Sequence, residues 1–101
     1  MAKRSKIVQN QRRTRVVVQQ AAKRAALKAV IADPDASPDE RFVAVRRLSS
    51  LKRDGSLVRL RNRDAVDGRP RGFLRVAGIS RVRFRSMAHR GELPGIVKSS
   101  W

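Results

Sequence analysis

The sequence predicts a mainly α-helical and irregular protein: a long basic N-terminal helix, two short helices, an extended Arg/Gly-rich segment and an extended C-terminal tail. Three observations support this fold class. Residues 6–31 contain neither Gly nor Pro, and their second half is dominated by Ala, Leu, Gln, Lys and Arg, which favour helix. The stretch "DPDASPDE" at 33–40 ends that helix and begins another. Beyond residue 52, Gly and Pro recur so often that regular structure must thin out.

The second helix is predicted over residues 38–50 from its first turn. Ser37 suits the N-cap, Pro38 the first helical position, and Glu40 completes an S-x-x-E capping box. Phe42, Val45 and Leu48 then follow one face, as in a short helix. In the first helix the small residues Ala22, Ala25, Ala26 and Ala29 are expected to allow close packing, and the valines at 16–18 could interrupt the helix.

The chain after residue 52 is expected to be extended, with one further helix. In "KRDGSLVRLRNRD", arginines at alternate positions 59, 61 and 63 suit an extended basic arm, and "DGRPRG" suits a turn. The short apolar stretch "FLRVAG" is expected to be extended as well. Ser80 can cap a helix that runs to about His89 and stops at Gly91.

Charge divides the chain into parts. Residues 1–32 carry nine Lys or Arg and no acid, residues 33–54 carry five of each sign, and residues 55–101 carry eleven basic and three acidic side chains. We therefore expect a helical extension over 1–54 and a nucleic-acid-binding region over 55–101, within one domain whose core is thin. The formal net charge of +17 opposes compaction, so a polyanion is expected to be part of the folded state.

Several function classes are disfavoured. The chain has no Cys, hence no disulfide framework and no thiolate metal site, and no apolar run near the ~20 residues of a membrane span, so we expect a soluble intracellular protein. His89 stands alone without the partners of a catalytic triad, and its proximity to Arg85 and Arg90 favours a surface or RNA-facing role. Asp64 and Asp67 lack an imidazole or thiolate nearby in sequence. We therefore expect no enzymatic activity, no metal and no cofactor.

Arginine points to the partner. It supplies 19 of the 25 basic residues and is concentrated in "NRDAVDGRPRGFLRVAGISRVRFR" at 62–85, where glycines place it on bends. Guanidinium groups bind phosphate in a planar, bidentate way, and Gly-broken basic loops suit folded RNA better than a regular DNA groove. RNA binding is therefore predicted, and a nonspecific, nucleoid-type DNA-coating protein is the alternative.

The run "RNRDAVDGRPRGFLRVAGISRVRFR" at 61–85, followed by "RGELPG" and "KSSW", resembles the bacterial small-subunit ribosomal protein S-fourteen family, and the N-terminal half resembles its long form. The resemblance implies a structural protein of cytoplasmic ribosomes, bound to the 3′ domain of 16S ribosomal RNA in the subunit head, beside the third and tenth numbered small-subunit proteins. The expected RNA-binding residues are Arg61, Arg63, Arg69, Arg71, Arg75, Arg81 and Arg85, together with Lys98 of the tail. Trp101 is expected either to fray or to stack on a base or fill a protein pocket.

One departure from the family concerns zinc. Many members have four cysteines that bind structural zinc in a zinc-ribbon-like segment, whereas the matching positions here are Asp64, Asp67, Ser80 and Arg83. Because a guanidinium is permanently protonated, Arg83 cannot be a ligand, and the resemblance is to the zinc-free branch. We expect Asp64 or Asp67 to pair with Arg83, with Ser80 capping the helix and four apolar side chains packing over the pair, namely Phe73, Leu74, Ile79 and Phe84. The alternative is that Asp67 only makes a turn with Gly68 and Asp64 faces water.

Overall fold

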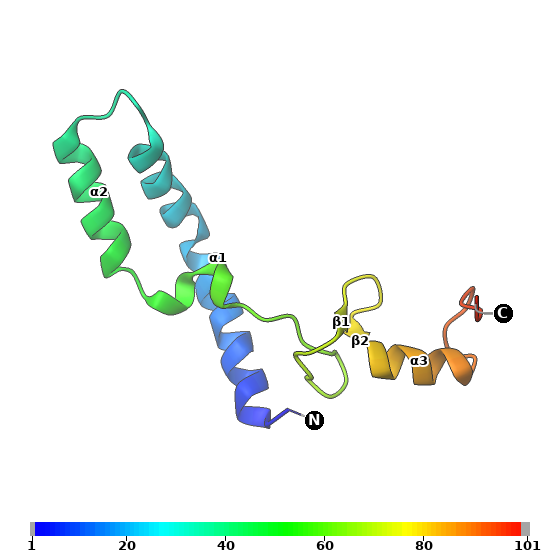
Figure 1. Cartoon of the computed structure of the whole chain (residues 1–101). Helices are drawn as coiled ribbons and strands as arrows, with labels where there is room; N and C mark the ends of the chain where they lie inside the picture. Colours follow the sequence, from blue (N-terminus) through cyan, green and yellow to red (C-terminus); the bar gives the residue numbers. More distant parts are fainter. Residues whose placement is uncertain (1, 100–101) are drawn as a thin grey trace. The chain divides into compact units, whose positions relative to one another are not determined.

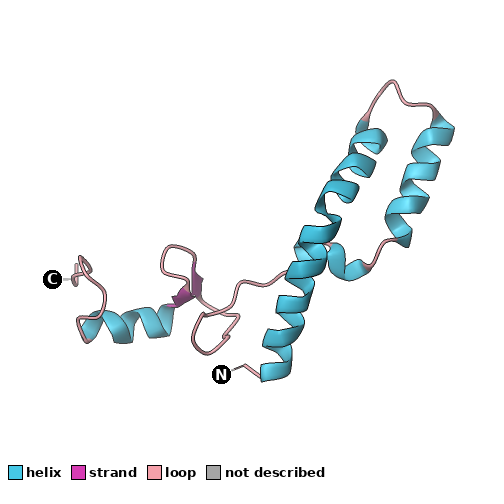
Figure 2. Cartoon of the chain, turned by 180° about the vertical axis from the view of Figure 1, so that it is seen from behind, coloured by secondary structure: helices cyan, strands magenta, loops and turns pink. Residues whose placement is uncertain are grey.

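The computed structural model describes residues 2–99 and is mainly helical, as the sequence predicts. Helix α1 spans Arg4–Ala32, α2 spans Pro38–Ser50 and α3 spans Arg81–His89 (Figure 1). Two 3-10 turns, η1 at Arg53–Gly55 and η2 at Leu57–Arg59, follow α2. A two-stranded antiparallel sheet consists of β1 at Phe73–Leu74 and β2 at Ile79–Ser80 (Figure 2). The zinc-ribbon likeness of this segment stays a prediction.

Contacts divide the chain into two compact units, each described here by itself. Residues 9–60 form one unit, which we call the helical hairpin. Within the described part of the chain, residues 2–8 and 61–99 form the other, which we call the Arg-rich unit. The expected functional division at residue 54 stays a prediction. Across residues 2–99, no helix combines the length and the apolar character needed to cross a bilayer.

In the helical hairpin, α2 runs antiparallel beside the second half of α1 (Figures 1 and 2). The predicted capping box is present: the Ser37 hydroxyl accepts from the Glu40 N–H at 3.2 Å, and the Glu40 carboxylate accepts from the Ser37 N–H at 3.1 Å. The Arg41 guanidinium donates to the carbonyl oxygens of Asp33 and Pro34, at 2.7 and 2.8 Å. These bonds fix the loop that turns the chain back, and the valines at 16–18 do not interrupt α1.

The helix predicted from the apolar stripe of α2 is confirmed, but the stripe itself is only partly buried. Phe42 is 62% and Val45 48% exposed, whereas Ala44 is buried and Leu48 half-buried. The small Ala44 side chain thus lies on the buried side of α2, whereas the larger Phe42 points outward, where Arg46 lies 5.8 Å from its ring centroid.

The alanine stripe of α1 does not pack within the helical hairpin, and its close packing against another molecule stays a prediction. The small residues Ala22, Ala25, Ala26 and Ala29 are exposed, and Val17 is the buried residue of the helix. The row that follows it toward the loop is half-buried and bulkier, and consists of Gln20, Arg24, Leu27 and Ile31. These longer side chains cover more apolar surface than an alanine stripe could, which explains the choice of face.

Two stretches expected to be extended turn instead. The Asp54 carboxylate lies 2.9 Å from the Arg59 guanidinium and 3.0 Å from that of Arg13. Because Arg59 can reach Asp54 only if the chain turns, residues 57–59 form η2 rather than the start of a basic arm. The stretch "FLRVAG" is a hairpin, in which β1 leads into a turn that ends at Gly78, φ 67°, before β2.

In the Arg-rich unit, the start of the chain contacts the turn at residues 64–69. The Ala2 N–H donates to the Asp67 carbonyl at 3.3 Å. Gly68 is buried with φ 72°, and a β-carbon there would collide with the Ile7 side chain. Glycine is therefore required at position 68 both by its backbone conformation and by the close approach of the first helical turn.

Candidate nucleic-acid interface

The Arg-rich segment is closed at its base by Asp64. Its side chain is fully buried, and its two carboxylate oxygens accept from the Ser80 N–H at 2.6 Å and the Val66 N–H at 2.8 Å. The Nε of Arg83 lies 3.4 Å from the same oxygen that binds Ser80. One carboxylate therefore joins the turn after residue 64, the end of β2 and the first turn of α3.

Asp67 completes this arrangement. Its carboxylate accepts from the Arg69 N–H at 3.0 Å and lies 3.2 Å from a terminal nitrogen of Arg83. The Ser80 hydroxyl accepts from the Arg83 N–H at 3.4 Å and caps α3. The predicted pairing is confirmed for both aspartates at once, and the alternative of a water-facing Asp64 is wrong. We call Asp64, Asp67 and Arg83 the Asp–Arg cluster.

Both aspartates of the Asp–Arg cluster are held in the ionised form. Burial alone would raise the pKa of Asp64, but the N–H groups of Ser80 and Val66 and the Ser80 hydroxyl outweigh it and lower that pKa far below the usual range. The pKa of Asp67 is lowered chiefly by the Arg69 N–H, with a smaller contribution from Arg83. The cluster therefore pairs two carboxylates with one guanidinium at neutral pH.

The residues at the family's zinc positions do not fit a zinc ion. Arg83 places a permanent cation against both carboxylates, and the Ser80 hydroxyl is engaged in capping. Within residues 2–99, no group of three or more His, Cys, Asp or Glu side chains could hold a metal. The ion-pair cluster stands where the ligand set would be.

Apolar side chains cover the cluster less completely than expected. Ile79 is buried, and Phe73 and Phe84 are half-buried, but Leu74 is 37% exposed. Most of the closure of this unit is therefore polar, and the hydrophobic contribution from these four residues is modest.

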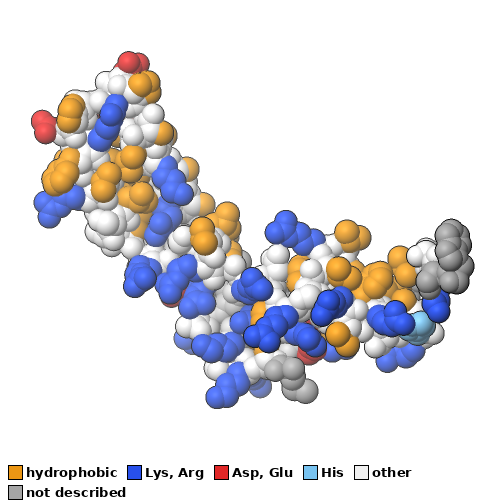
Figure 3. Space-filling view, in the orientation of Figure 1, with side chains coloured by type: hydrophobic (Ala, Val, Ile, Leu, Met, Phe, Trp, Pro, Cys, Tyr) orange, Lys and Arg blue, Asp and Glu red, His pale blue; other side chains and the backbone are white. Residues whose placement is uncertain are grey.

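The predicted RNA-binding side chains differ in exposure. Five arginines and one lysine on the Arg-rich unit are exposed, namely Arg61, Arg71, Arg75, Arg81, Arg85 and Lys98. Figure 3 shows Lys and Arg side chains gathered over this unit. Arg63 and Arg69 are half-buried, and the Arg63 guanidinium donates to the Gly68 carbonyl at 2.9 Å, so Arg63 also supports the turn.

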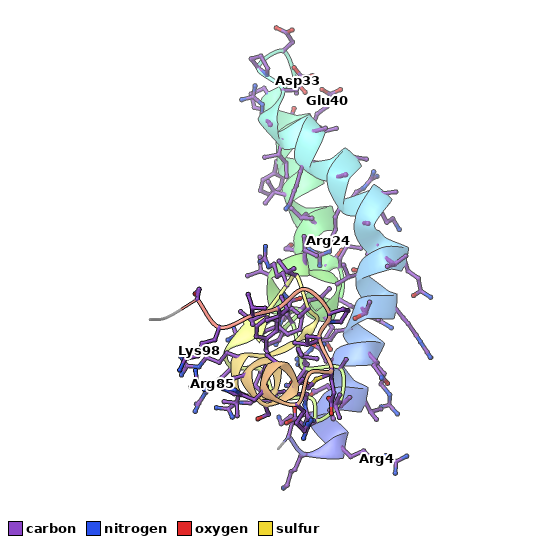
Figure 4. The ribbon with its side chains drawn as sticks, turned by 90° about the vertical axis from the view of Figure 1, so that its right-hand side faces the viewer. Arg4, Arg24, Asp33, Glu40, Arg85 and Lys98 are labelled. Atoms are coloured by element: carbon purple, nitrogen blue, oxygen red, sulfur yellow. The ribbon has the colours of Figure 1, made fainter. Side chains whose placement is uncertain are left out.

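Arg85 and Lys98 lie together, although 13 positions separate them in the chain. Both line an open pocket of about 400 Å³ between α3 and the tail, with Phe84 and Ile96 among its apolar walls (Figure 4). His89 lines the same pocket. Its position here agrees with the surface-facing alternative expected from its proximity to Arg85, which lies four positions before it on the same helix face. Trp101 lies outside the described residues.

Comparisons with known proteins identify the family. The family model described as ribosomal protein S14p/S29e matches residues 47–100. The chain is 64% identical, over the full length of both chains, to small ribosomal subunit protein uS14 of Cutibacterium acnes. It is 61% identical, also over the full length of both chains, to uS14A of Mycolicibacterium smegmatis and to uS14 of Leifsonia xyli. This chain therefore belongs to the ribosomal protein S14p/S29e family.

Proposed function

We propose that this chain binds 16S ribosomal RNA in the 3′ domain of the small-subunit head, beside the third and tenth numbered small-subunit proteins, and supports subunit assembly and translation. Its general role follows from its family. It is a structural protein of the small ribosomal subunit rather than an enzyme, and it is part of ribosomes in the cytoplasm. The family membership disfavours the alternative of a DNA-coating protein.

One observation carries the RNA-binding proposal. The Asp–Arg cluster engages one arginine of this unit, Arg83, which pairs with both of its carboxylates. The exposed guanidinium groups of the Arg-rich unit are thereby left outside the cluster and on the surface. Long cationic side chains on a small, glycine-bent scaffold suit phosphates that follow no regular groove.

The proposed division of labour follows the charge. Residues 55–101 bind RNA, and residues 1–54 are an extension of that region. The proposed RNA-binding residues are Arg61, Arg63, Arg69, Arg71, Arg75, Arg81, Arg85 and Lys98. Of these, Arg63 has a second role, because it supports the turn at Gly68.

The proposal is tested by exchanging exposed arginines in the full chain. Arg71→Ala combined with Arg75→Ala is expected to weaken retention in small subunits and to expose 16S nucleotides of the 3′ domain to chemical probing. Arg90→Ala is the matched control, because Arg90 is exposed in the same unit but pairs with Glu92 at 2.8 Å and is not a proposed contact.

Two results would contradict the proposal. The first is a chain that sediments with DNA rather than with small subunits in a gradient. The second is a double variant whose RNA protection matches that of Arg90→Ala, which would remove these arginines from the interface.

A further inference from the structure

A groove lies near the loop end of the helical hairpin, between the end of α1 and the start of α2. Its volume is about 590 Å³, and apolar side chains from both helices line it, including Leu27, Val30 and Val43. Val30 is 39% and Val43 45% exposed. Because both valines line the groove and remain partly exposed, the groove can accept an apolar side chain from a partner.

The rim of this groove is acidic, which is unusual in this chain. Four of the eight acidic residues lie between positions 33 and 40, and no Lys or Arg occurs between Lys28 and Arg41. All four line the groove, namely Asp33, Asp35, Asp39 and Glu40. Figure 4 shows Asp33 and Glu40 at the loop end of the hairpin, and Figure 3 shows acidic side chains there.

Nearby cations only partly offset this charge. The Arg41 guanidinium bonds to the carbonyl oxygens of Asp33 and Pro34 rather than to a carboxylate. The Asp33 and Glu40 carboxylates accept from main-chain N–H groups, which leaves their negative charge in place. Arg47 is the one basic residue among the described groove residues. Four carboxylates against one guanidinium leave the groove negative.

This combination disfavours RNA as the occupant, because the rim would repel phosphates. It favours a peptide segment with both aliphatic and basic side chains. Lys and Arg can lay their methylene stems along Val30 and Val43 while their charged ends reach the carboxylates of the rim. The apolar wall supplies contact area, and the rim supplies selectivity for positive charge.

We propose that the groove docks a basic segment of another small-subunit protein, so that the helical hairpin makes a protein contact while the Arg-rich unit binds RNA. This inference rests on the proposed place in the small subunit. The helical hairpin would then bind a positively charged partner, whereas the Arg-rich unit would bind negatively charged RNA.

A matched pair of variants tests the groove in the full chain. Val43→Ser removes a groove side chain, whereas Val45→Ser makes the same change two positions along the same helix, at 48% exposure, outside the groove. Helix propensity changes equally in both. When the two variants compete for a limiting amount of small subunits that lack this protein, Val43→Ser should be retained about fourfold less, the loss expected for half of a valine contact. Equal retention of the two variants would overturn the proposal.

The identity of the occupant is tested by placing a photo-crosslinking benzoylphenylalanine at position 43 or 45 in assembled subunits. The expected product at position 43 is a crosslink to a Lys/Arg-rich peptide of a small-subunit protein, found by mass spectrometry and weaker from position 45. A crosslink to RNA, to a peptide that is not basic, or at equal yield from both positions would overturn it. Failure of the unaltered chain to enter small subunits would instead refute the proposed function.

Discussion

Replacing the Asp64 carboxylate by the nearly isosteric amide of Asn tests whether the Asp–Arg cluster closes the Arg-rich unit. Asp64 accepts from two main-chain N–H groups, at 2.6 and 2.8 Å, with its side chain fully buried. Asn keeps one acceptor oxygen but presents an NH₂ group where the second acceptor stood. One buried N–H group of Ser80 or Val66 must then lose its partner, and Arg83 loses one of its two carboxylates.

The size of the effect follows from these contacts. A hydrogen bond to a charged group contributes about 1.5–3 kcal/mol, and a buried donor left unpaired costs about 1–3 kcal/mol. These two contributions overlap, so Asp64→Asn is expected to cost roughly 2–4 kcal/mol of ordering free energy. If ordering of the unit is coupled to RNA binding, this becomes a loss of about 30- to 700-fold in affinity.

The assay is binding of the full chain to a 16S 3′-domain RNA at fixed salt, with hydrogen exchange of the Ser80 and Val66 amides in the complex. Glu92→Gln is the control, because its carboxylate is 44% exposed and pairs with Arg90 only two positions away. That control should change affinity by less than about fivefold. If Asp64→Asn matched it, with both amides still protected, the cluster would not close the unit.

The lowered pKa of Asp64 also predicts how the stability of the Arg-rich unit depends on pH. The pKa of Asp64 in the folded chain lies below its ordinary 3.8, so its contribution to stability is present above about pH 3.8 and is lost as the pH falls below it. Asp64→Asn has already lost that contribution at neutral pH. Its unfolding in complex with RNA should therefore depend less on pH below 3.8 than that of the unaltered chain.

Three further tests with variants concern the Arg-rich unit, and one measurement concerns the free chain. Asp67→Ala and Arg83→Ala should together cost less RNA affinity than the sum of the single changes, because both remove the same 3.2 Å contact; additive costs would show no coupling. Arg71→Ala should reduce the slope of log affinity against log salt by about 0.7–0.9, and an unchanged slope would remove this side chain from the interface. Gly68→Ala should weaken binding more than Gly78→Ala, since both glycines have positive φ but only position 68 lacks room for a β-carbon; equal losses would leave only the backbone effect. The free chain should show no cooperative thermal transition by circular dichroism at low salt, and such a transition would contradict folding on RNA.

The parts predicted correctly from the sequence are those set by neighbouring residues. Ser37 and Glu40 are three positions apart, and the capping box that they form requires only a local turn, so the start of α2 was predictable. Ser80 likewise caps α3 through the N–H of a residue three positions later. The contact between the turn at Asp64 and the start of α3 was predictable only through the family resemblance, because Asp64 and Ser80 are 16 positions apart in the chain.

The sequence pattern was less informative about which helix face is buried and about where the chain turns. Phe42, Val45 and Leu48 share a helical stripe, but Ala44 with Leu48 makes another, and side-chain size decides which one packs. Periodicity shows which apolar residues share a stripe but does not decide which of two stripes is buried. The alternating arginines at 59, 61 and 63 predict an extended arm, and this prediction is wrong for Arg59. Its ion pair with Asp54 across a turn does not follow from the alternation of basic residues.

The Asp–Arg cluster lies at the positions that the family resemblance assigns to zinc ligands, and an ion-pair cluster stabilises a fold less than a metal does. Structural zinc contributes roughly 10–16 kcal/mol in small zinc-finger peptides, several times the roughly 2–4 kcal/mol expected for the buried Asp64 contacts. The hydrophobic core cannot supply the difference, because within residues 2–99 the buried apolar side chains are Val17, Ala44 and Ile79. The charge of +17 further opposes compaction of the free chain. If RNA phosphates neutralise the exposed arginines as proposed, they would provide much of the stability that zinc gives to a small zinc-binding domain, and ordering of the Arg-rich unit and RNA binding would then be a single coupled step.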